Sequence, residues 1–282
     1  MMYERVCMVL SKCISEGATM LKNSNVAEYE LDAWYLAEHV FDVTRMAYLM
    51  SPNQVISEEN YDKYMDMIQL RCTHVPLQHI IGVQEFMGLE FLVNEHVLIP
   101  RQDTECLVEE VLQYSKGKSV LDICTGSGCI IISIEKLGQV EKADAIDISK
   151  DALSVAQENA TRLGANVEFY ESDLFSQITQ KYDIIVSNPP YIPTKVIEGL
   201  MEEVRDHEPF IALDGKEDGL YFYRKIIKEA RQYLNPCGRI FFEIGCEQGC
   251  AVKELLEEQG FIDVTIKKDL AGLDRVVLAR LA

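Results

Sequence analysis

The tetrapeptide Asn188-Pro189-Pro190-Tyr191 carries the residue types best suited to chemistry, and it directly follows the apolar run 182–187. Two consecutive prolines have no N–H group to donate and hold the backbone extended, so that nearby carbonyl oxygens can face a ligand. The side-chain oxygen of Asn188 and the carbonyl oxygen of Pro189 could together accept both hydrogens of a planar NH2 group. The alternative interpretation is a rigid turn that only ends a strand.

Such a pair of acceptors suits a reaction in which a planar nitrogen is the nucleophile. An amide NH2 reacts poorly because its lone pair is delocalised into the carbonyl group. Two acceptors would fix the nitrogen and favour the charge that develops on it, and orientation in line with an electrophile adds a further rate advantage. The ring of Tyr191 could pack on the planar group. The motif therefore predicts attack by a planar nitrogen, with no strong base required.

A second candidate site lies in the glycine-rich turn that follows the short apolar run 119–122. Small residues at a strand-to-helix turn let the backbone approach a ligand, and the helix that follows offers unpaired N–H groups. The turn departs from the usual pattern at its first position, where a cysteine replaces glycine and would be accommodated by a negative φ. Its residues are Cys124, Thr125, Gly126, Ser127 and Gly128.

Carboxylates follow the next two expected strands. Asp147 lies 19 positions beyond Gly128, about the spacing at which a carboxylate meets ribose hydroxyls in nucleotide-binding βαβ units. Its alternative role is to cap the helix that begins after Ser149. Asp173 follows the third strand and could accept a hydrogen bond from an adenine amino group. Because ligands bind at the carboxyl ends of parallel strands, these positions predict a nucleoside-like ligand.

The elements that would position these residues change character along the chain. Apolar residues recur at helical spacing over 29–49 and again from a Ser57 cap to about Cys72, which predicts a helical domain over 1–75. Gly82 and Gly88 then punctuate a partly alternating stretch, which predicts a β-hairpin linker over 76–102. From 103 to 282 strand and helix patterns alternate, which predicts an α/β catalytic domain.

The alternation in residues 103–282 is typical of a parallel sheet with helices on both faces. Helices are expected over 150–163 and 220–234. The last two strands are separated by a glycine-containing loop, which predicts an antiparallel pair at the end of the sheet. Strands are expected over 119–122, 143–147, 167–170, 182–187, 239–244, 264–267 and 275–279.

Composition narrows the class of function. A net charge of −19 disfavours a protein that grips nucleic acid through a basic surface. Nine scattered cysteines without metal-ligand spacing indicate free thiols and no metal site. Neither a long apolar run nor a signal peptide is present, so we expect a cytoplasmic protein with no membrane association.

The sequence of strands, turn and carboxylates resembles the seven-stranded, Rossmann-like methyltransferase fold. A dinucleotide-binding enzyme ordinarily continues G-x-G-x-x-G, whereas the third glycine position here is Ile131. This departure favours S-adenosylmethionine over NAD as the ligand of the turn.

Several motifs accompany Asn188–Tyr191, namely Pro76–Gly82, Leu98–Glu105, His207-Glu208-Pro209, Ala212-Leu213 and Asp218-Gly219-Leu220. Together they resemble the bacterial peptide chain release factor glutamine N5-methyltransferase family over essentially the whole chain. The resemblance implies that the substrate is the glutamine of the Gly-Gly-Gln motif in class 1 release factors, and that the helical domain recognises that partner.

The resemblance implies that Cys124–Gly128, Asp147, Asp173, Leu174 and Asn188 line the S-adenosylmethionine site. Leu174 stands where some family members have an aromatic residue, so that Phe175 is an alternative partner for adenine, and Arg101 and Thr104 either shape the same pocket or cap the next helix. Asn188, Pro189, Pro190 and Tyr191 would hold the glutamine.

Two other substrates stay open as alternatives. The ribosomal protein L3 glutamine methyltransferases share the fold, Asn-Pro-Pro-Tyr and His-Glu-Pro, but usually lack the Asp-Thr-Glu found at 103–105. An adenine-N6 nucleic-acid methyltransferase is disfavoured by the acidic charge and by the absence of a recognisable target-recognition domain. A module that binds the cofactor without chemistry is disfavoured by the intact Asn188–Tyr191 motif.

Overall fold

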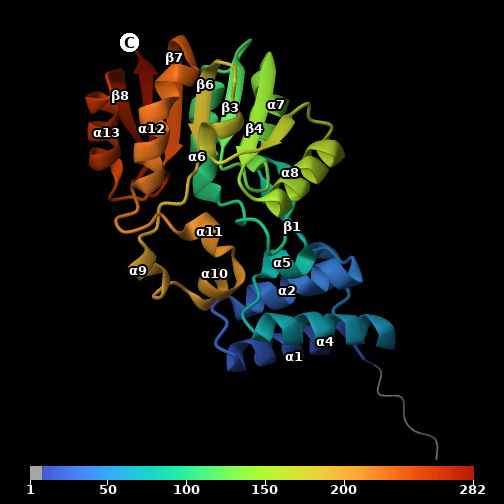
Figure 1. The fold of residues 1–282 in the computed structure, drawn as a ribbon. Helices are drawn as coiled ribbons and strands as arrows, with labels where there is room; N and C mark the ends of the chain where they lie inside the picture. The colour runs from blue at the N-terminus through green and yellow to red at the C-terminus, as the bar shows by residue number, and fades with distance from the viewer. Residues whose placement is uncertain (1–7) are drawn as a thin grey trace, which may run out of the picture. The chain divides into compact units, whose positions relative to one another are not determined.

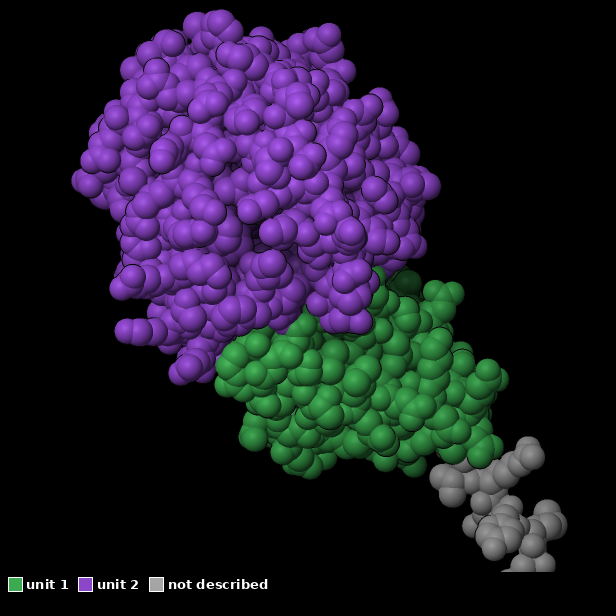
Figure 2. All heavy atoms as spheres, viewed as in Figure 1, with its two compact units in different colours: residues 1–82, 202–207 green, residues 83–201, 208–282 purple. Residues whose placement is uncertain are grey.

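The computed structural model describes residues 8–282, which divide into two compact units (Figure 2). The first unit contains the chain up to Gly82 together with Glu202–His207, and the second contains Val83–Met201 and Glu208–Ala282. The chain therefore passes between the units three times. A short segment from the middle of the sequence belongs to the N-terminal unit, which the sequence did not indicate.

The first unit is helical (Figure 1). Its elements are α1 (Leu10–Asn23), α2 (Tyr29–Phe41), α3 (Arg45–Met50), α4 (Glu58–Cys72), α5 (Leu77–Ile81) and α10 (Glu202–His207). The helix predicted over 29–49 is broken, because Asp42 adopts a left-handed φ of 50° and Thr44 caps a new helix by accepting from Ala47 N. The predicted cap at Ser57 is present and accepts from Asn60 N.

A buried arginine organises the first unit. The guanidinium of Arg71 donates to Asp32 across 2.8 Å, to the carbonyl of Val75 across 3.1 Å and to Glu203 across 2.5 Å. Asp32 and Arg71 are buried, so each charge depends on the other for compensation. Through Glu203 the same cation holds α10, whose His207 ring also contacts the carbonyl of Thr73.

The second unit begins with an antiparallel hairpin of β1 (Val83–Phe86) and β2 (Leu89–Leu92). A sheet of seven strands follows, in the order β5-β4-β3-β6-β7-β9-β8. The first five strands in that order are parallel and β9 is antiparallel to both of its neighbours, which confirms the predicted fold class. The strands are β3 (Ser119–Ile123), β4 (Lys142–Asp147), β5 (Glu168–Glu171), β6 (Tyr182–Ser187), β7 (Leu234–Glu243), β8 (Phe261–Lys268) and β9 (Asp274–Leu281).

Helices cover both faces of this sheet because its strands are apolar on both faces. Leu121 and Ile185 point into a core shared with α12 and α13, whereas Val120 and Ile184 point into a core shared with α6 and α7. The helices and turns of this unit are α6 (Gln102–Leu112), α7 (Cys129–Gly138), α8 (Lys150–Leu163), the 3-10 turn η1 (Leu174–Gln177), α9 (Thr194–Ile197), α11 (Phe210–Leu213), α12 (Tyr221–Tyr233) and α13 (Gly249–Glu258).

Three general properties concern residues 8–282 only. Every cysteine described in this range is a free thiol. Within the same range, no group of histidine, cysteine and acidic side chains is arranged as a metal site. No helix of the described chain has the length and apolar character needed to cross a membrane.

Candidate functional site

A pocket of about 310 Å³ lies at the carboxyl ends of the central strands β3, β4 and β6. In the sheet β3 lies between β4 and β6, so successive crossovers leave it in opposite directions and open a crevice there. The loops before α6 and around α11 contribute the remaining walls. Most of the residues predicted to bind a cofactor line this pocket, namely Cys124, Thr125, Gly126, Ser127, Asp147, Asp173, Leu174 and Asn188.

Two glycines with positive φ angles shape the backbone of the glycine-rich turn. Gly126 has a φ of 55° with open space where a Cβ would lie. Gly128 is the N-cap of α7, with a φ of 78°, and a Cβ there would lie 2.9 Å from Ile132. Gly128 does not line the pocket, and the absence of a side chain there lets α7 begin close to Ile132 and Ala156. The hydroxyl of Thr125 donates to the buried carboxylate of Asp122 across 2.6 Å.

The negative φ that would accommodate a cysteine at position 124 is not found. The φ of Cys124 is 61°, in the left-handed region that costs a residue with a Cβ roughly 1 kcal/mol or more. The neighbours impose this conformation, because Thr125 N donates to Ile146 O of the adjacent strand across 3.1 Å. Burial and the nearby Asp147 and Asp122 raise the pKa of the Cys124 thiol well above its usual value. The side chain is therefore a neutral wall of the pocket.

Asp147 links the glycine-rich turn to the residue that caps α8 through its two carboxylate oxygens. One accepts from Gly126 N across 2.9 Å and the other from Ser149 N across 2.9 Å. The cap of α8 is Ser149, whose hydroxyl oxygen accepts from Ala152 N, so the alternative role of Asp147 as the cap does not apply. Burial raises the pKa of Asp147, and the two backbone N–H groups oppose that shift.

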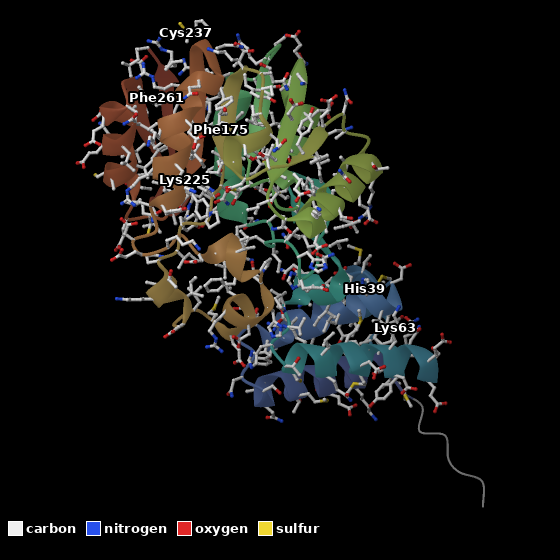
Figure 3. All side chains as sticks on the ribbon, viewed as in Figure 1. His39, Lys63, Phe175, Lys225, Cys237 and Phe261 are labelled. Carbon is white, nitrogen blue, oxygen red and sulfur yellow. The ribbon has the colours of Figure 1, made fainter. Side chains whose placement is uncertain are left out.

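Leu174, rather than Phe175, lines the pocket. Leu174 is nearly buried, with a φ of 48° that turns the chain into η1. Phe175 lies in the core, stacked on Tyr233 with 4.5 Å between ring centroids (Figure 3). Half-exposed Ile148 also lines the pocket. Leu174 and Ile148 therefore provide aliphatic surface in the pocket, and Tyr221 and Phe222 of α12 provide aromatic surface.

The Asn188–Tyr191 motif divides into two pairs. Asn188 and Pro190 line the pocket, whereas Pro189 and Tyr191 do not. Pro189 is buried. The half-buried Tyr191 directs its hydroxyl at Glu243, across 3.4 Å to Oε1. Burial raises the pKa of the Tyr191 hydroxyl, which therefore stays protonated and is able to donate.

The backbone of Tyr191 is fixed by segments that lie far from it in the sequence. Its carbonyl accepts from Gln248 Nε2 across 3.0 Å. Gly219 packs so closely that a Cβ would lie 2.3 Å from the Tyr191 oxygen, and a Cβ on Gly215 would lie 2.7 Å from its carbonyl carbon. The next residue, Ile192, donates from N to Leu213 O across 3.0 Å. The motifs at 212–213 and 218–220 therefore act as a scaffold for Tyr191.

The Leu98–Glu105 motif connects the pocket to the surrounding loops. Arg101 is the residue before α6 but makes no side-chain cap, and its guanidinium instead pairs with the buried carboxylate of Glu208. Thr104 is buried and lines the pocket. Asp103 pairs with Arg275 across 3.1 Å, and Glu105 accepts from Met87 N in the hairpin turn across 2.6 Å.

Two buried carboxyls close to the site have raised pKa values. Burial raises the pKa of Asp122 to about 7, although the hydrogen bond from Thr125 acts to lower it. Burial likewise raises the pKa of Glu243 to about 7, although Thr104 and Arg275 act to lower it. Glu243 was not predicted from the sequence, although an acidic residue within the predicted strand 239–244 is a signal of the same kind as Asp147.

The pocket walls also contain residues that were not predicted from the sequence. Within the linker 76–102 the sequence predicts a pocket role only for Arg101, which does not line the pocket, and it predicts none for α11 or the start of α12. Lys225 of α12, labelled in Figure 3, places a cation at this wall and lies 4.8 Å from the Tyr221 ring centroid. The missed lining residues are His96, Val97, Leu98, Pro100, Ile123, Cys129, Ile130, Ile146, Ile148, Ser149, Ala152, Ser172, Pro209, Ile211, Ala212, Lys216, Tyr221, Phe222 and Lys225.

Comparison with known proteins identifies both regions of the chain. Residues 12–82 match the family model described as the PrmC N-terminal domain, and residues 102–204 match the methyltransferase small domain. Solved structures support the fold of the second unit. A methyltransferase from Pyrococcus furiosus is 19% identical with a TM-score of 0.53, covering 68% of this chain and 89% of that protein. The Thermus thermophilus 16S rRNA N2 G1207 methyltransferase is 17% identical with a TM-score of 0.51, covering 71% of this chain and 50% of that one.

Full-length relatives are much more similar in sequence. The release factor glutamine methyltransferase of Clostridium botulinum is 42% identical over 97% of this chain and 99% of its own length. That of Clostridium acetobutylicum is 40% identical over 96% and 98%, and that of Bacillus subtilis is 41% identical over 83% and 85%. The chain therefore belongs to the release factor glutamine methyltransferase family.

Proposed function

We propose that this enzyme methylates the side-chain amide nitrogen, N5, of the glutamine in the Gly-Gly-Gln motif of class 1 release factors, with S-adenosylmethionine as the methyl donor. The observation that carries the proposal is the position of Asn188 and Pro190. Both line the pocket at the end of the strand β6, where an amide would meet a ligand bound along the glycine-rich turn.

The residues of the pocket fit S-adenosylmethionine. The open space at Gly126 allows close approach to the backbone. One oxygen of Asp147 accepts from Gly126 N and the other from Ser149 N, which leaves a lone pair on each oxygen for ribose hydroxyls. Asp173 can accept from an adenine amino group, between the aliphatic side chains of Ile148 and Leu174. When bound, the donor supplies an electrophilic methyl group on a sulfonium.

The role proposed for the tetrapeptide is to hold the amide. The side-chain oxygen of Asn188 accepts one N–H of the glutamine amide and the carbonyl of Pro189 accepts the other, since a proline carbonyl keeps its acceptor even where the proline side chain is buried. The two acceptors favour charge that develops on the nitrogen and fix its direction of attack. The nitrogen becomes acidic as it is methylated, so its proton passes to solvent without a strong base.

Recognition of the release factor is assigned to the helical region at 1–75, because a glycine-rich loop offers the pocket few side chains to grip. Remote contacts of this kind also help to position the reacting group. Deletion of 1–75 would test the idea poorly, since it removes both Arg71 and Asp32 and so releases Glu203 of α10. Substitutions of exposed residues such as Leu49 and Met50 leave that anchor intact.

Those substitutions separate recognition from chemistry. Leu49→Ser with Met50→Ser should raise KM for intact release factor and leave KM for a short Gly-Gly-Gln peptide unchanged. Equal KM changes for both substrates would remove the recognition role.

Transfer of labelled methyl groups tests the proposed activity directly. Purified release factor, ribosomal protein L3 and DNA are offered side by side, with a release factor whose Gly-Gly-Gln glutamine is replaced by alanine as control. The proposal expects label in the wild-type release factor alone. Label in L3 would support the alternative protein substrate, and label retained by the control release factor would refute the assignment of the glutamine.

A further inference from the structure

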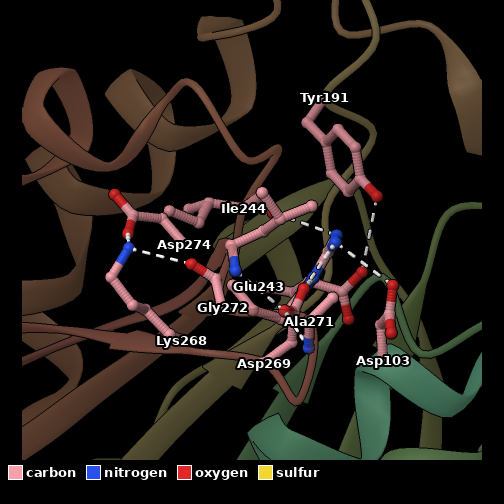
Figure 4. A network of polar contacts seen from close by, with 11 residues as sticks. Asp103, Tyr191, Glu243, Ile244, Lys268, Asp269, Ala271, Gly272 and Asp274 are labelled. Carbon is pink, nitrogen blue, oxygen red and sulfur yellow. Dashed lines mark hydrogen bonds and ion pairs between the residues drawn. The ribbon is translucent and has the colours of Figure 1, made fainter.

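A buried polar network lies behind the Asn188–Tyr191 motif and has no part in the chemistry proposed above (Figure 4). Its centre is Glu243, the last residue of β7, which is 2% exposed. β6 and β7 are parallel neighbours in which Ser187 lies opposite Phe242. The register therefore brings the carboxyl at the end of β7 beside the motif that follows β6. The Tyr191 hydroxyl donates to Glu243 Oε1 across 3.4 Å.

The residues around Glu243 compensate only part of the cost of burying its carboxyl, because Oε2 is buried with no hydrogen-bond partner among the described residues. Arg275 of β9 is the nearby cation, and Asp269 and Asp103 each hold its guanidinium across 3.1 Å (Figure 4). Arg275 and Thr104 lower the pKa of Glu243 against the effect of burial. The neighbouring strand residues Ile240, Phe241 and Phe242 are apolar and fully buried, so an apolar residue would suit the strand better. A buried carboxyl with one unpartnered oxygen costs stability, so its presence at this position indicates a function other than stability.

Tyr191 is the group on which Glu243 acts. The backbone of Tyr191 is fixed by Gln248 and by the close approach of Gly219, whereas its ring has one polar attachment, the hydroxyl. We propose that Glu243 is a positioning residue for methyl transfer, which fixes the Tyr191 ring through its hydroxyl and thereby the shape of the amide site formed with Asn188 and Pro190. The inference rests on the proposed function.

The strength of this attachment depends on pH. The pKa of Glu243 is raised to about 7 by burial, so the carboxyl is ionised above that pH and neutral below it. An ionised acceptor makes the stronger hydrogen bond with the Tyr191 hydroxyl. The kcat of the wild-type enzyme should therefore fall as the pH decreases through about 7. The groups that face Glu243 are Asp103 and Thr104 of α6, Cys129 of α7, Tyr191, Tyr223 of α12 and Arg275 of β9.

The test uses the full-length enzyme and the variants Glu243→Gln, Tyr191→Phe and the double variant. Glu243→Gln keeps the shape of the side chain and removes its ionisation. The matched control is Asp144→Asn, because Asp144 is also buried and accepts from a tyrosine hydroxyl, that of Tyr182 across 2.5 Å, without lining the pocket. For each variant kcat and KM are measured from pH 6 to pH 9, and the free energy of unfolding is measured with urea.

We expect Glu243→Gln to lower kcat by about fivefold to tenfold at pH 8, the difference between a charged and a neutral acceptor, and to abolish the acidic limb of the pH profile. Tyr191→Phe should lose at least as much, and the double variant should lose no more than Tyr191→Phe, because one hydrogen bond is removed in each case. Asp144→Asn should lower stability and keep both kcat and the acidic limb.

Three results would overturn the positioning role. They are an unchanged kcat in Glu243→Gln, multiplicative losses in the double variant, and an equal loss in Asp144→Asn. The unfolding free energies give a separate measure, since coupling between Glu243 and Tyr191 in the double-mutant cycle requires no turnover. If the wild-type enzyme transferred no methyl group to release factor, the proposed function would fail, and this coupling would still report whether Glu243 holds Tyr191.

Discussion

Replacement of Gly219 by alanine is the sharpest test of the scaffold that holds Tyr191. Gly219 has a φ of 74°, and an added Cβ would lie 2.3 Å from the carbonyl oxygen of Tyr191 and 2.6 Å from Gln248 Nε2. Ordinary contacts of a Cβ begin at 3.4 Å. The Tyr191 backbone must therefore move by about 1 Å, and its hydrogen bond with Gln248 is lost or displaced.

The magnitude follows from three contributions. The left-handed φ costs an alanine about 1 kcal/mol, and the lost hydrogen bond costs about another 1 kcal/mol. The displacement itself acts on catalysis, since a shift of about 1 Å at a positioning group costs about 10²-fold in rate. We therefore expect Gly219→Ala to lower the free energy of unfolding by about 2 kcal/mol or more and kcat by about 10²-fold.

The matched control is Gly164→Ala at the end of α8. Gly164 has a φ of 64°, and nothing lies within 4 Å of its added Cβ, so it shares only the conformational cost of about 1 kcal/mol. Its Tm should fall by about 2 to 4 °C with kcat unchanged. Tm comes from thermal unfolding and kcat from methyl transfer to release factor. Equal losses of Tm and kcat in the two variants would refute the role of Gly219 as a scaffold for Tyr191.

Three further predictions concern the pocket and the buried Asp122 beside its turn. Asn188→Ala removes an amide acceptor and should lower kcat by about 10²-fold or more, and a variant of near-normal activity would exclude that role. In Asp147→Asn the side-chain NH2 group would face the backbone N–H of Gly126 or Ser149, and two donors cannot pair. Calorimetry should therefore show that the Kd for S-adenosylmethionine rises by about tenfold or more. An unchanged Kd would contradict this role of Asp147. Because burial raises the pKa of Asp122 to about 7, its protonated form favours folding at low pH, and that stabilisation is lost as pH rises from about 4 through 7. Asp122→Asn should accordingly raise Tm relative to wild type more at pH 8 than at pH 5, whereas parallel Tm curves would refute the shift.

The strands of the second unit were predictable because their patterns are local. Buried parallel strands are continuous apolar runs, and six of the seven began within three residues of the expected position. The helix over 150–163 was predicted to the residue, since Ser149 supplies its cap and Gly164 its left-handed end. β7 begins at Leu234, five residues before the expected Arg239, because an irregular stretch with Cys237 at a φ of 61° still pairs with β6.

Backbone conformation was less predictable where tertiary contacts decide it. Cys124 adopts a positive φ because both ends of the turn are tied to neighbouring strands and to Asp147, an arrangement that no local propensity encodes. Asp42 likewise ends α2 in the left-handed region, although residues 29–49 have a continuous helical pattern. Short polar side chains tolerate that conformation better than most, which makes such a break possible but does not locate it.

The residues that act on the amide and those that hold them in place differ in how sequence encodes them. Asn188 and its neighbours form a contiguous motif whose chemistry follows from residue type. Their supports come from separate segments, since Tyr191 is fixed by Gly219, Gln248 and Glu243, which lie 28 to 57 positions away. A residue that acts through another carries no chemical signature of its own, and only the register of β6 against β7 brings Glu243 to Tyr191. The chemistry could therefore be predicted from one motif, whereas the residues that position it could be identified only from the pairing of strands in the sheet.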